Sequence, residues 1–258
     1  MKLLAAVSFA VFAAASVVSA QTPECPCPIP PATPPLWFGK AEFSFLSTSG
    51  NTDTTSIGGS LELNYKPAPW LFTLKGAYLK AATDGITTAE SFTGSMRGSR
   101  DLLPRLDVYA NASYLRNKFS GIENLYGFDG GAGYKFLDSP VVFLRLEGGV
   151  GWAHEEDLLL PPPAPPITTT KSYAIVKSAL AFKWQFTKVA AFTNDFTFID
   201  DLDDTSNWFM TDKAAISAQI SSIFALQASW TLLYRNQPSS PVFGHTDTAT
   251  AISLVAKF

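Results

Sequence analysis

Apolar and polar residues alternate along the chain from Trp37 to Phe258 in about twelve runs. Alternation with a period of two is typical of β-strands that have one apolar and one polar face. In the first run, Phe43 and Phe45 share one face while Glu42 lies on the other. The pattern therefore predicts an all-β domain of about twelve antiparallel strands.

Period-two alternation does not say which face is inside, because a water-soluble barrel and a membrane barrel share it. The connections between the runs differ in length. Short connections are expected at 66–69, 102–105, 137–140, 187–188 and 221–222, and longer ones at 81–87, 116–123, 154–170, 200–207 and 236–245. Short periplasmic turns and longer outer loops are typical of outer-membrane barrels. We therefore predict a transmembrane antiparallel β-barrel whose last strand pairs with the first, since lipid leaves no backbone group unpaired.

The N-terminal segments indicate export. Residues 1–20 begin with Lys2, continue through an apolar run and end in Val18-Ser19-Ala20, which favours a signal peptide cleaved near Ala20 over a retained anchor. Residues 21–36 are rich in proline and are predicted to form a periplasmic tether. The barrel is assigned to 37–258, in the bacterial cell outer membrane.

The two cysteines, Cys25 and Cys27, lie within the tether and cannot close a long loop. A local or intermolecular disulfide and a lipid anchor on Cys25 are both open, although the residues before Cys25 do not suit lipidation. Their fate is not determined by the sequence.

Charge and composition limit the partners. Removal of Lys2 with the signal peptide changes 19 Lys and Arg to 18, against 22 Asp and Glu, a net charge of −4. This balance argues against nucleic acid as a partner. The expected partners are outer-membrane lipid, lipopolysaccharide and the outer-membrane barrel assembly machinery, and the oligomeric state is not determined.

The polar face is charged and is predicted to line the lumen. Its basic residues are Lys40, Lys75, Arg97, Arg145, Lys171, Lys177, Lys183, Lys213, Arg235 and Lys257, and its acidic residues are Glu42, Glu62, Asp107, Asp129, Glu147, Asp195 and Asp247. These charges could guide small polar solutes, or they could pair across the bore and fill it. About eight strands leave room only for side chains and wide aqueous channels need about sixteen, so a twelve-stranded barrel allows both outcomes.

The chain ends in a strand with Ile252 and Leu254 at alternate positions before a final aromatic, Phe258. This ending resembles the signal by which the assembly machinery recognises its substrates. The simpler interpretation is a last β-strand that happens to end in phenylalanine.

Candidate chemistry is sparse. The only histidines, His154 and His245, fall in predicted outer connections and neither lies in a His-x-Ser or His-Ser step. A hydrolase would need a serine from another strand near one of them, so we expect no enzyme and no cofactor. Acidic residues at 155–157 and 200–204 are expected to form a solvated rim; divalent cations are the alternative, but the spacing fits no defined metal site.

Residues 37–54 contain Trp-Phe-Gly, with the pattern Trp-x-Gly, and then Ser-Gly-Asn-Thr at 49–52, followed by an alternating strand ending near Tyr65. This opening resembles the salt-induced outer-membrane proteins of the YdiY-like family, a domain of unknown function (DUF481). The resemblance implies an outer-membrane location and an osmotic or salt-responsive role. It offers no catalytic residue to transfer.

Two functions are compatible with these features. The first is a narrow passive channel for small hydrophilic solutes, or a protein of envelope integrity under osmotic stress. The alternative is a structural or adhesive barrel with an occluded lumen, which binds a partner or cations through its outer loops.

Overall fold

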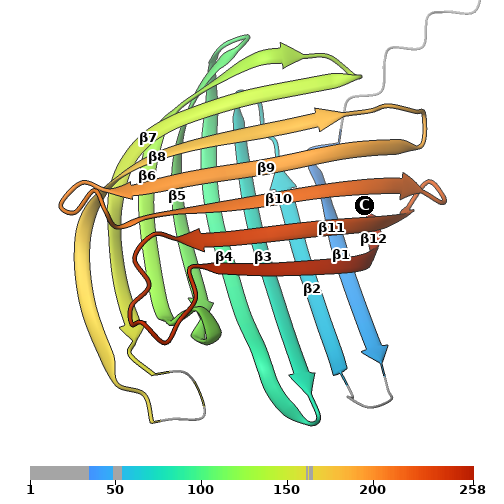
Figure 1. The fold of residues 1–258 in the computed structure, drawn as a ribbon. Coiled ribbons are helices and arrows are strands. Elements are labelled where there is room, and N and C mark those ends of the chain that lie inside the picture. Colours follow the sequence, from blue (N-terminus) through green and yellow to red (C-terminus); the bar gives the residue numbers. More distant parts are fainter. Residues whose placement is uncertain (1–34, 49–53, 161, 163–164) are drawn as a thin grey trace, which may run out of the picture. The chain divides into compact units, whose positions relative to one another are not determined.

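The structure is a computed structural model that describes residues 35–48, 54–160, 162 and 165–258. Within these residues twelve antiparallel strands form one closed barrel (Figure 1). The strands are β1 (Trp37–Thr48), β2 (Thr54–Tyr65), β3 (Trp70–Thr83), β4 (Ile86–Leu103), β5 (Leu106–Asn117), β6 (Ile122–Asp138), β7 (Val142–Leu158), β8 (Thr168–Trp184), β9 (Ala190–Asp201), β10 (Trp208–Gln219), β11 (Phe224–Arg235) and β12 (Thr246–Lys257). The prediction of an all-β barrel of about twelve strands is confirmed.

Each strand pairs with its neighbours in the chain, and β12 pairs with β1 to close the sheet. One helical turn, η1 (Lys118–Ser120), is described between β5 and β6. Among the described residues no helix is long and apolar enough to cross a membrane. The predicted signal peptide and all but the last two residues of the predicted tether lie outside the described residues. We call the barrel end with Trp37 and Phe258 the periplasmic end, following the sequence, and the other the outer end.

The distribution of exposed side chains shows which face of the sheet points outward. Met96 and Phe128, on the apolar face, are 65% and 62% exposed, whereas Glu155 and Asp157, on the polar face, are 1% and 3% exposed. A protein in water would bury the first pair and expose the second. The apolar face is therefore the outer face, as a barrel surrounded by lipid requires.

Aromatic rings gather at the periplasmic ends of the strands. Trp37 stacks on Tyr65 with ring centroids 4.4 Å apart, and Trp184 lies 5.6 Å from Phe186. Rings with an apolar body and a polar edge suit the boundary between lipid tails and headgroups. These contacts place an aromatic girdle at this end.

The predicted outer loop at 81–87 is wrong. β3 continues to Thr83 and β4 begins at Ile86, so only Asp84 and Gly85 make the turn. Both have positive φ, 50° and 78°, as a two-residue hairpin of type I′ requires. The alternation was obscured because the register shifts at Ala81 and Ala82, which offer no contrast between an apolar and a polar face.

The predicted loop at 154–170 is also too long. β7 continues to Leu158 and β8 begins at Thr168, so the connection covers 159–167. His154 and the acidic residues 155–157 lie in β7. Charged residues near a strand end suit a solvated loop and a polar lumen equally, and this ambiguity caused the error.

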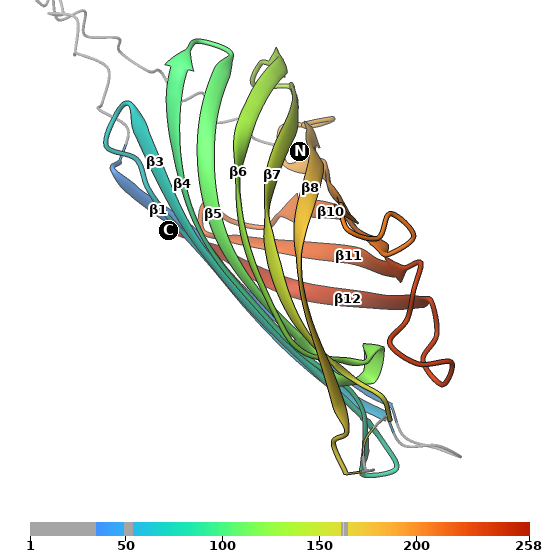
Figure 2. The same cartoon turned by 90° about the vertical axis from the view of Figure 1, so that its left-hand side faces the viewer.

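The pair that closes the barrel is the shortest among the described strands. β1 pairs with β12 from Lys40, opposite Lys257, to Ser44, opposite Ser253. In contrast, β1 pairs with β2 along its whole length, and β12 pairs with β11 from residue 246 to residue 256. From the closed part, β1 and β12 diverge toward the outer end in both views (Figures 1 and 2).

Candidate functional site

The interior of the barrel contains three groups of charged and polar side chains. Side chains on the inner face of strands that are not neighbours can meet only through the lumen, so their contacts show where the lumen is crossed. The outer clamp consists of Glu155, Asp157, Lys171, Tyr173 and Arg235. The inner network consists of Arg97, Asp107, Asn111, Asp129, Arg145, Glu147 and Lys177. The vestibule cluster consists of Lys40, Glu42, Glu62, Lys75 and Lys213.

The outer clamp ties β11 to β7 at the outer end of the lumen. Arg235 Nη2 donates to Glu155 Oε1 at 2.7 Å, and Nη1 donates to Asp157 Oδ1 at 3.1 Å. Three strands separate β7 from β11 in the sheet. Tyr173 Oη donates to the second Glu155 oxygen at 2.8 Å, and Lys171 Nζ lies 3.3 Å from that oxygen. Arg235, Glu155 and Asp157 are 4%, 1% and 3% exposed, so the ion pairs at the centre of the clamp are shielded from water, whereas the Lys171 side chain is 37% exposed.

Apolar side chains pack next to the clamp inside the lumen. Ala153, Tyr173 and Ile175 form a buried cluster with Ile122 and Leu125 of β6. Leu115, Ile199, Phe209 and Leu233 pack against this cluster. These residues come from β5 to β11, so this whole side of the outer mouth is filled by side chains.

The connection 236–245, between β11 and β12, covers the clamp from outside. Ser239 Oγ donates to the carbonyl oxygen of Leu158 at 2.7 Å. Phe243 is buried against Gly121, where an added Cβ would lie 3.0 Å from the phenylalanine ring. Gly121 has φ 81°, a conformation that glycine adopts without strain. The loop therefore contributes to the closed mouth.

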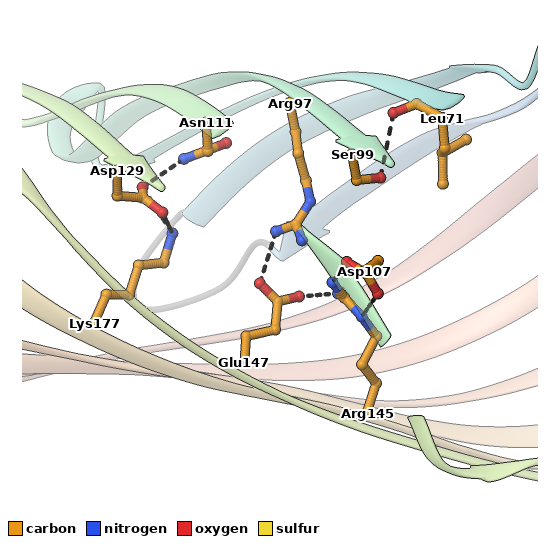
Figure 3. A network of polar contacts seen from close by, with 9 residues as sticks. All are labelled: Leu71, Arg97, Ser99, Asp107, Asn111, Asp129, Arg145, Glu147 and Lys177. Atoms are coloured by element: carbon orange, nitrogen blue, oxygen red, sulfur yellow. Dashed lines mark hydrogen bonds and ion pairs between the residues drawn. The ribbon is translucent and has the colours of Figure 1, made fainter. Parts of the chain in front are cut away.

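The inner network crosses the lumen nearer the periplasmic end (Figure 3). Arg97 Nη1, from β4, donates to Glu147 Oε2 of β7 at 2.7 Å. Arg145 binds the other Glu147 oxygen and donates from Nε to Asp107 Oδ2 of β5 at 3.0 Å. The Arg97 guanidinium also lies 3.9 Å from the ring centroid of Tyr109. Basic and acidic groups thus alternate across this layer, and each charge has a partner.

A second part of the inner network lies at mid-barrel. Lys177 Nζ, from β8, lies 3.0 Å from Asp129 Oδ1 of β6, and Asn111 Nδ2 donates to the same oxygen at 2.8 Å (Figure 3). Lys177 keeps 14% of its side chain exposed and Asp129 keeps 3%. This part of the wall is therefore neutralised and rigidly held.

The vestibule cluster lies on the opposite part of the wall and remains open to water. Lys213 Nζ, from β10, lies 3.5 Å from Glu42 of β1, and Lys40 Nζ lies 3.3 Å from the same carboxylate. Lys75 Nζ lies 3.6 Å from Glu62. The side chains of Lys40, Lys75 and Lys213 are 41%, 55% and 41% exposed. Partial exposure of paired charges inside a barrel indicates space that water can enter.

The predicted lumen residues all take part in these groups except Lys183, Lys257, Asp195 and Asp247. Asp195 lies opposite Lys213 in the β9–β10 register. The expectation of a solvated rim at 155–157 is wrong for Glu155 and Asp157, which are buried in the clamp. Their odd numbers place them on the lumen face of β7, as they place Tyr173 on that of β8. This parity could have identified all three.

The acidic loop 200–204 is folded by its own hydrogen bonds. Asp201 is 4% exposed and accepts from Asn207 Nδ2 at 2.9 Å and from the backbone N–H of Asp203 at 2.9 Å. Hydrogen bonds from the side chain and backbone of Ser206 lower the pKa of Asp204. In the described part of the chain no group of three or more His, Cys, Asp or Glu side chains is placed to hold a metal ion.

His154 lies beside a serine, as a hydrolase would require. Its Nδ1 is 2.7 Å from Ser172 Oγ across the β7–β8 ladder, on the outer face of the barrel, and its ring lies 6.4 Å from that of Tyr126. Among the described residues no carboxylate or amide binds the second ring nitrogen of His154, so the orienting group of a catalytic triad is missing. His245 Nδ1 is 2.9 Å from the carbonyl oxygen of Arg235.

The terminal strand places Ile252 and Leu254 on the outer face, 66% and 47% exposed, and Phe258 is 64% exposed. The Phe258 N–H donates to the carbonyl oxygen of Gly39 at 3.1 Å, beside the closed part of the β1–β12 pair. Recognition by the assembly machinery and contact with lipopolysaccharide stay predictions.

A closed antiparallel barrel with an apolar outer surface, aromatic rings at its strand ends and a charged interior is an outer-membrane β-barrel. The chain belongs to the family described as "Protein of unknown function, DUF481", whose model matches residues 41–258. It is similar to "Uncharacterized protein YdiY" of Escherichia coli (strain K12), with 23% identity over 216 residues that cover 84% of this chain and 81% of the relative. The resemblance inferred from residues 37–54 is confirmed.

Solved structures show the same fold. The COG4313 outer membrane channel from Pseudomonas putida F1 has a TM-score of 0.52 and 11% identity, covering 88% of this chain and 97% of that one. The NanC porin has a TM-score of 0.47 and 8% identity, covering 86% and 97%.

Proposed function

We propose that this barrel is a narrow channel for small hydrophilic solutes whose outer mouth is closed at rest by the outer clamp. The observation that carries the proposal is the contrast between the two ends of the lumen. The vestibule cluster is charged and open to water, whereas the outer clamp is buried. A solute can therefore enter from the periplasmic side but meets a seal at the outer end.

Two polar groups in the lumen wall indicate that the inner network holds water. Tyr109 Oη and Arg97 Nη2 are buried and have no hydrogen-bond partner among the described residues. Buried polar groups are nearly always hydrogen-bonded, to protein or to water. Both groups can donate, so each can bind an ordered water within the inner network.

The chemistry of the clamp suits a latch. A buried ion pair adds little net stability compared with apolar packing, yet it fixes one geometry. Opening it would separate β7 from β11 without breaking any strand pairing. A channel that is closed at rest preserves the permeability barrier, which agrees with the salt-responsive role implied by the resemblance to salt-induced proteins.

Planar-bilayer recordings of the refolded protein test this proposal. We expect rare, brief openings in the wild type and a severalfold higher open fraction in Arg235→Met, which removes the charge and retains most of the side-chain volume. The matched control is Arg100→Met, because Arg100 lies on the outer face over Trp70, 5.4 Å from its ring centroid. Equal conductance in all three proteins would refute the latch, and no conductance in any of them would refute the channel.

The second candidate is a structural or adhesive barrel with an occluded lumen. It is favoured by the complete pairing of the inner network and by the packed loop 236–245. This candidate predicts no conductance in any clamp variant and loss of surface binding when the connection 159–167 is replaced by a short glycine-serine turn. Retained binding after this replacement would contradict it.

A further inference from the structure

The seam between β1 and β12 is closed by strand pairing only in its periplasmic half. Beyond Ser44, residues 45–48 of β1 pair with β2 alone. Residues 246–252 of β12 pair with β11 alone. No other neighbouring pair among the described strands leaves such a length of both edges unpaired.

The closed part of the seam is too short to cross the lipid. From Gly39, which bonds Phe258, to Ser44 is five residue steps. At ~3.3 Å per residue and a tilt of ~40°, these steps rise about 13 Å along the membrane normal, whereas the apolar band of an outer-membrane barrel is about 25 Å tall. About half of the apolar band, on the outer side, is therefore crossed without pairing between β1 and β12.

Unpaired strand edges at this depth need polar partners. A backbone N–H or C=O that faces hydrocarbon without a hydrogen bond costs several kcal/mol. The segment of β12 from Thr248 to Ile252 carries no charge, and its outward side chains include the hydroxyls of Thr248 and Thr250. The open edges can therefore form hydrogen bonds with an uncharged molecule that carries donors and acceptors.

Most of the lumen wall behind the seam is small and uncharged; the exception is Asp247, at the outer end of β12. Its inward side chains on β1, β2, β11 and β12 are partly exposed or buried and contribute hydroxyl and methyl groups: Ser44, Ser56, Ser60, Thr231, Ala249 and Ala251. The vestibule cluster begins at Glu42, directly on the periplasmic side of this wall. A molecule in the vestibule therefore reaches the seam without passing the outer clamp.

We propose that the outer half of the β1–β12 seam is a lateral opening through which a neutral amphiphile passes between the lumen and the outer leaflet. Its uncharged polar head bonds the serine hydroxyls and the open backbone edges. Its apolar body meets lipid and the exposed side chains of Phe45 and Ile252, which are 60% and 66% exposed. Ions are excluded because residues 45–48 of β1 and 248–252 of β12 offer no charge to replace their hydration. Passage through the seam does not require the clamp to open, because the clamp lies on the other side of the outer end.

A disulfide across the seam tests the opening. Continuation of the register that pairs Ser44 with Ser253 would place Ser47 opposite Thr250, so a disulfide between these positions forms only when the two diverging edges come together and close the seam. The full chain with Cys25→Ser and Cys27→Ser carries either Ser47→Cys with Thr250→Cys, in the open half, or Ala41→Cys with Ala256→Cys, which are partners in the closed half. The readout is the entry of N-phenyl-1-naphthylamine, an uncharged fluorescent amine, into intact cells; heat-modifiable gel mobility verifies that each barrel is folded.

We expect cells with the cysteine-free barrel to take up the probe severalfold faster than cells without it. Oxidation should reduce uptake to background in the open-half variant alone, and a reductant should restore it. Unchanged uptake after complete oxidation would overturn the proposal. So would a covalent dimer on a non-reducing gel, because it would make the seam a pairing surface between two copies. If clamp variants do not conduct but the seam disulfide still blocks the probe, the proposed hydrophilic channel fails and the lateral opening stands.

Discussion

Removal of Arg235 should destabilise the barrel far more than its place near a loop suggests. In Arg235→Met, the only basic partner described for Glu155 and Asp157 is Lys171, at 3.3 Å and 3.9 Å, and the lysine side chain is 37% exposed. Breaking a buried ion pair by removing one partner costs about 3–5 kcal/mol, because the remaining charge is uncompensated. With Arg235 and both carboxylates 4% exposed or less, we expect a loss in this range.

A cycle of variants separates the ion pair from general packing. The triple variant Arg235→Met, Glu155→Gln, Asp157→Asn carries no uncompensated carboxylate, so its free energy of unfolding should return to within about 1–2 kcal/mol of the wild type. Arg100→Met, on the outer face, should change the free energy by less than about 0.5 kcal/mol. The measurement is urea unfolding in lipid vesicles, followed by tryptophan fluorescence. A loss below about 1 kcal/mol for Arg235→Met, or a triple variant as unstable as the sum of its parts, would refute the reasoning.

Three further predictions concern other parts of the barrel. Gly149→Ala should lower the free energy of unfolding by about 1–3 kcal/mol, because the new methyl would meet a β6 carbonyl and Tyr109 Oη, each at 2.7 Å. In the control, Gly148→Ala, the methyl meets nothing within 4 Å and should not destabilise the barrel. Urea unfolding compares the two variants, and equal effects would contradict the geometry. Phe258→Ala should lower the fraction of folded barrel in the outer membrane severalfold while Phe258→Trp retains it, as heat-modifiable mobility would show; equal assembly would exclude the terminal signal. In a clamp-open background Lys75→Glu should shift the reversal potential in a salt gradient toward cation selectivity, and no shift would show that the vestibule does not line the path.

The strands and their faces could be predicted because alternation is a local property. Lys177 and Asp129 lie 48 residues apart, yet each shows its lumen-facing side through an apolar residue next to it, Val176 and Phe128. Since a strand has a period of two, one apolar neighbour fixes the face of every residue in the run. The fold class, the strand number and the charged lumen followed from this regularity.

The contacts across the lumen could not be predicted because alternation gives a face and not a partner. Arg235 reaches Glu155 over a separation of 80 residues, and only the packing of the β5–β11 wall brings β7 and β11 close enough. The same wall buries Asp157, whose charge in a sequence suits a loop equally well. The short β1–β12 pair is likewise hidden, because both strands alternate normally and only their mutual register leaves the outer edges unpaired.

The two sides of the outer end differ in charge, the property that most strongly determines which solutes can pass. The β5–β11 side is sealed by three buried charges that must be separated before anything hydrophilic can pass. On the other side, residues 45–48 of β1 and 248–252 of β12 carry no charge but have backbone edges that lipid cannot satisfy. A charged solute that passes the clamp must replace Arg235 or its carboxylates, whereas a neutral molecule at the seam must only replace hydrogen bonds. Loss of the clamp should therefore change ionic conductance without changing entry of a neutral probe, and closure of the seam should do the reverse.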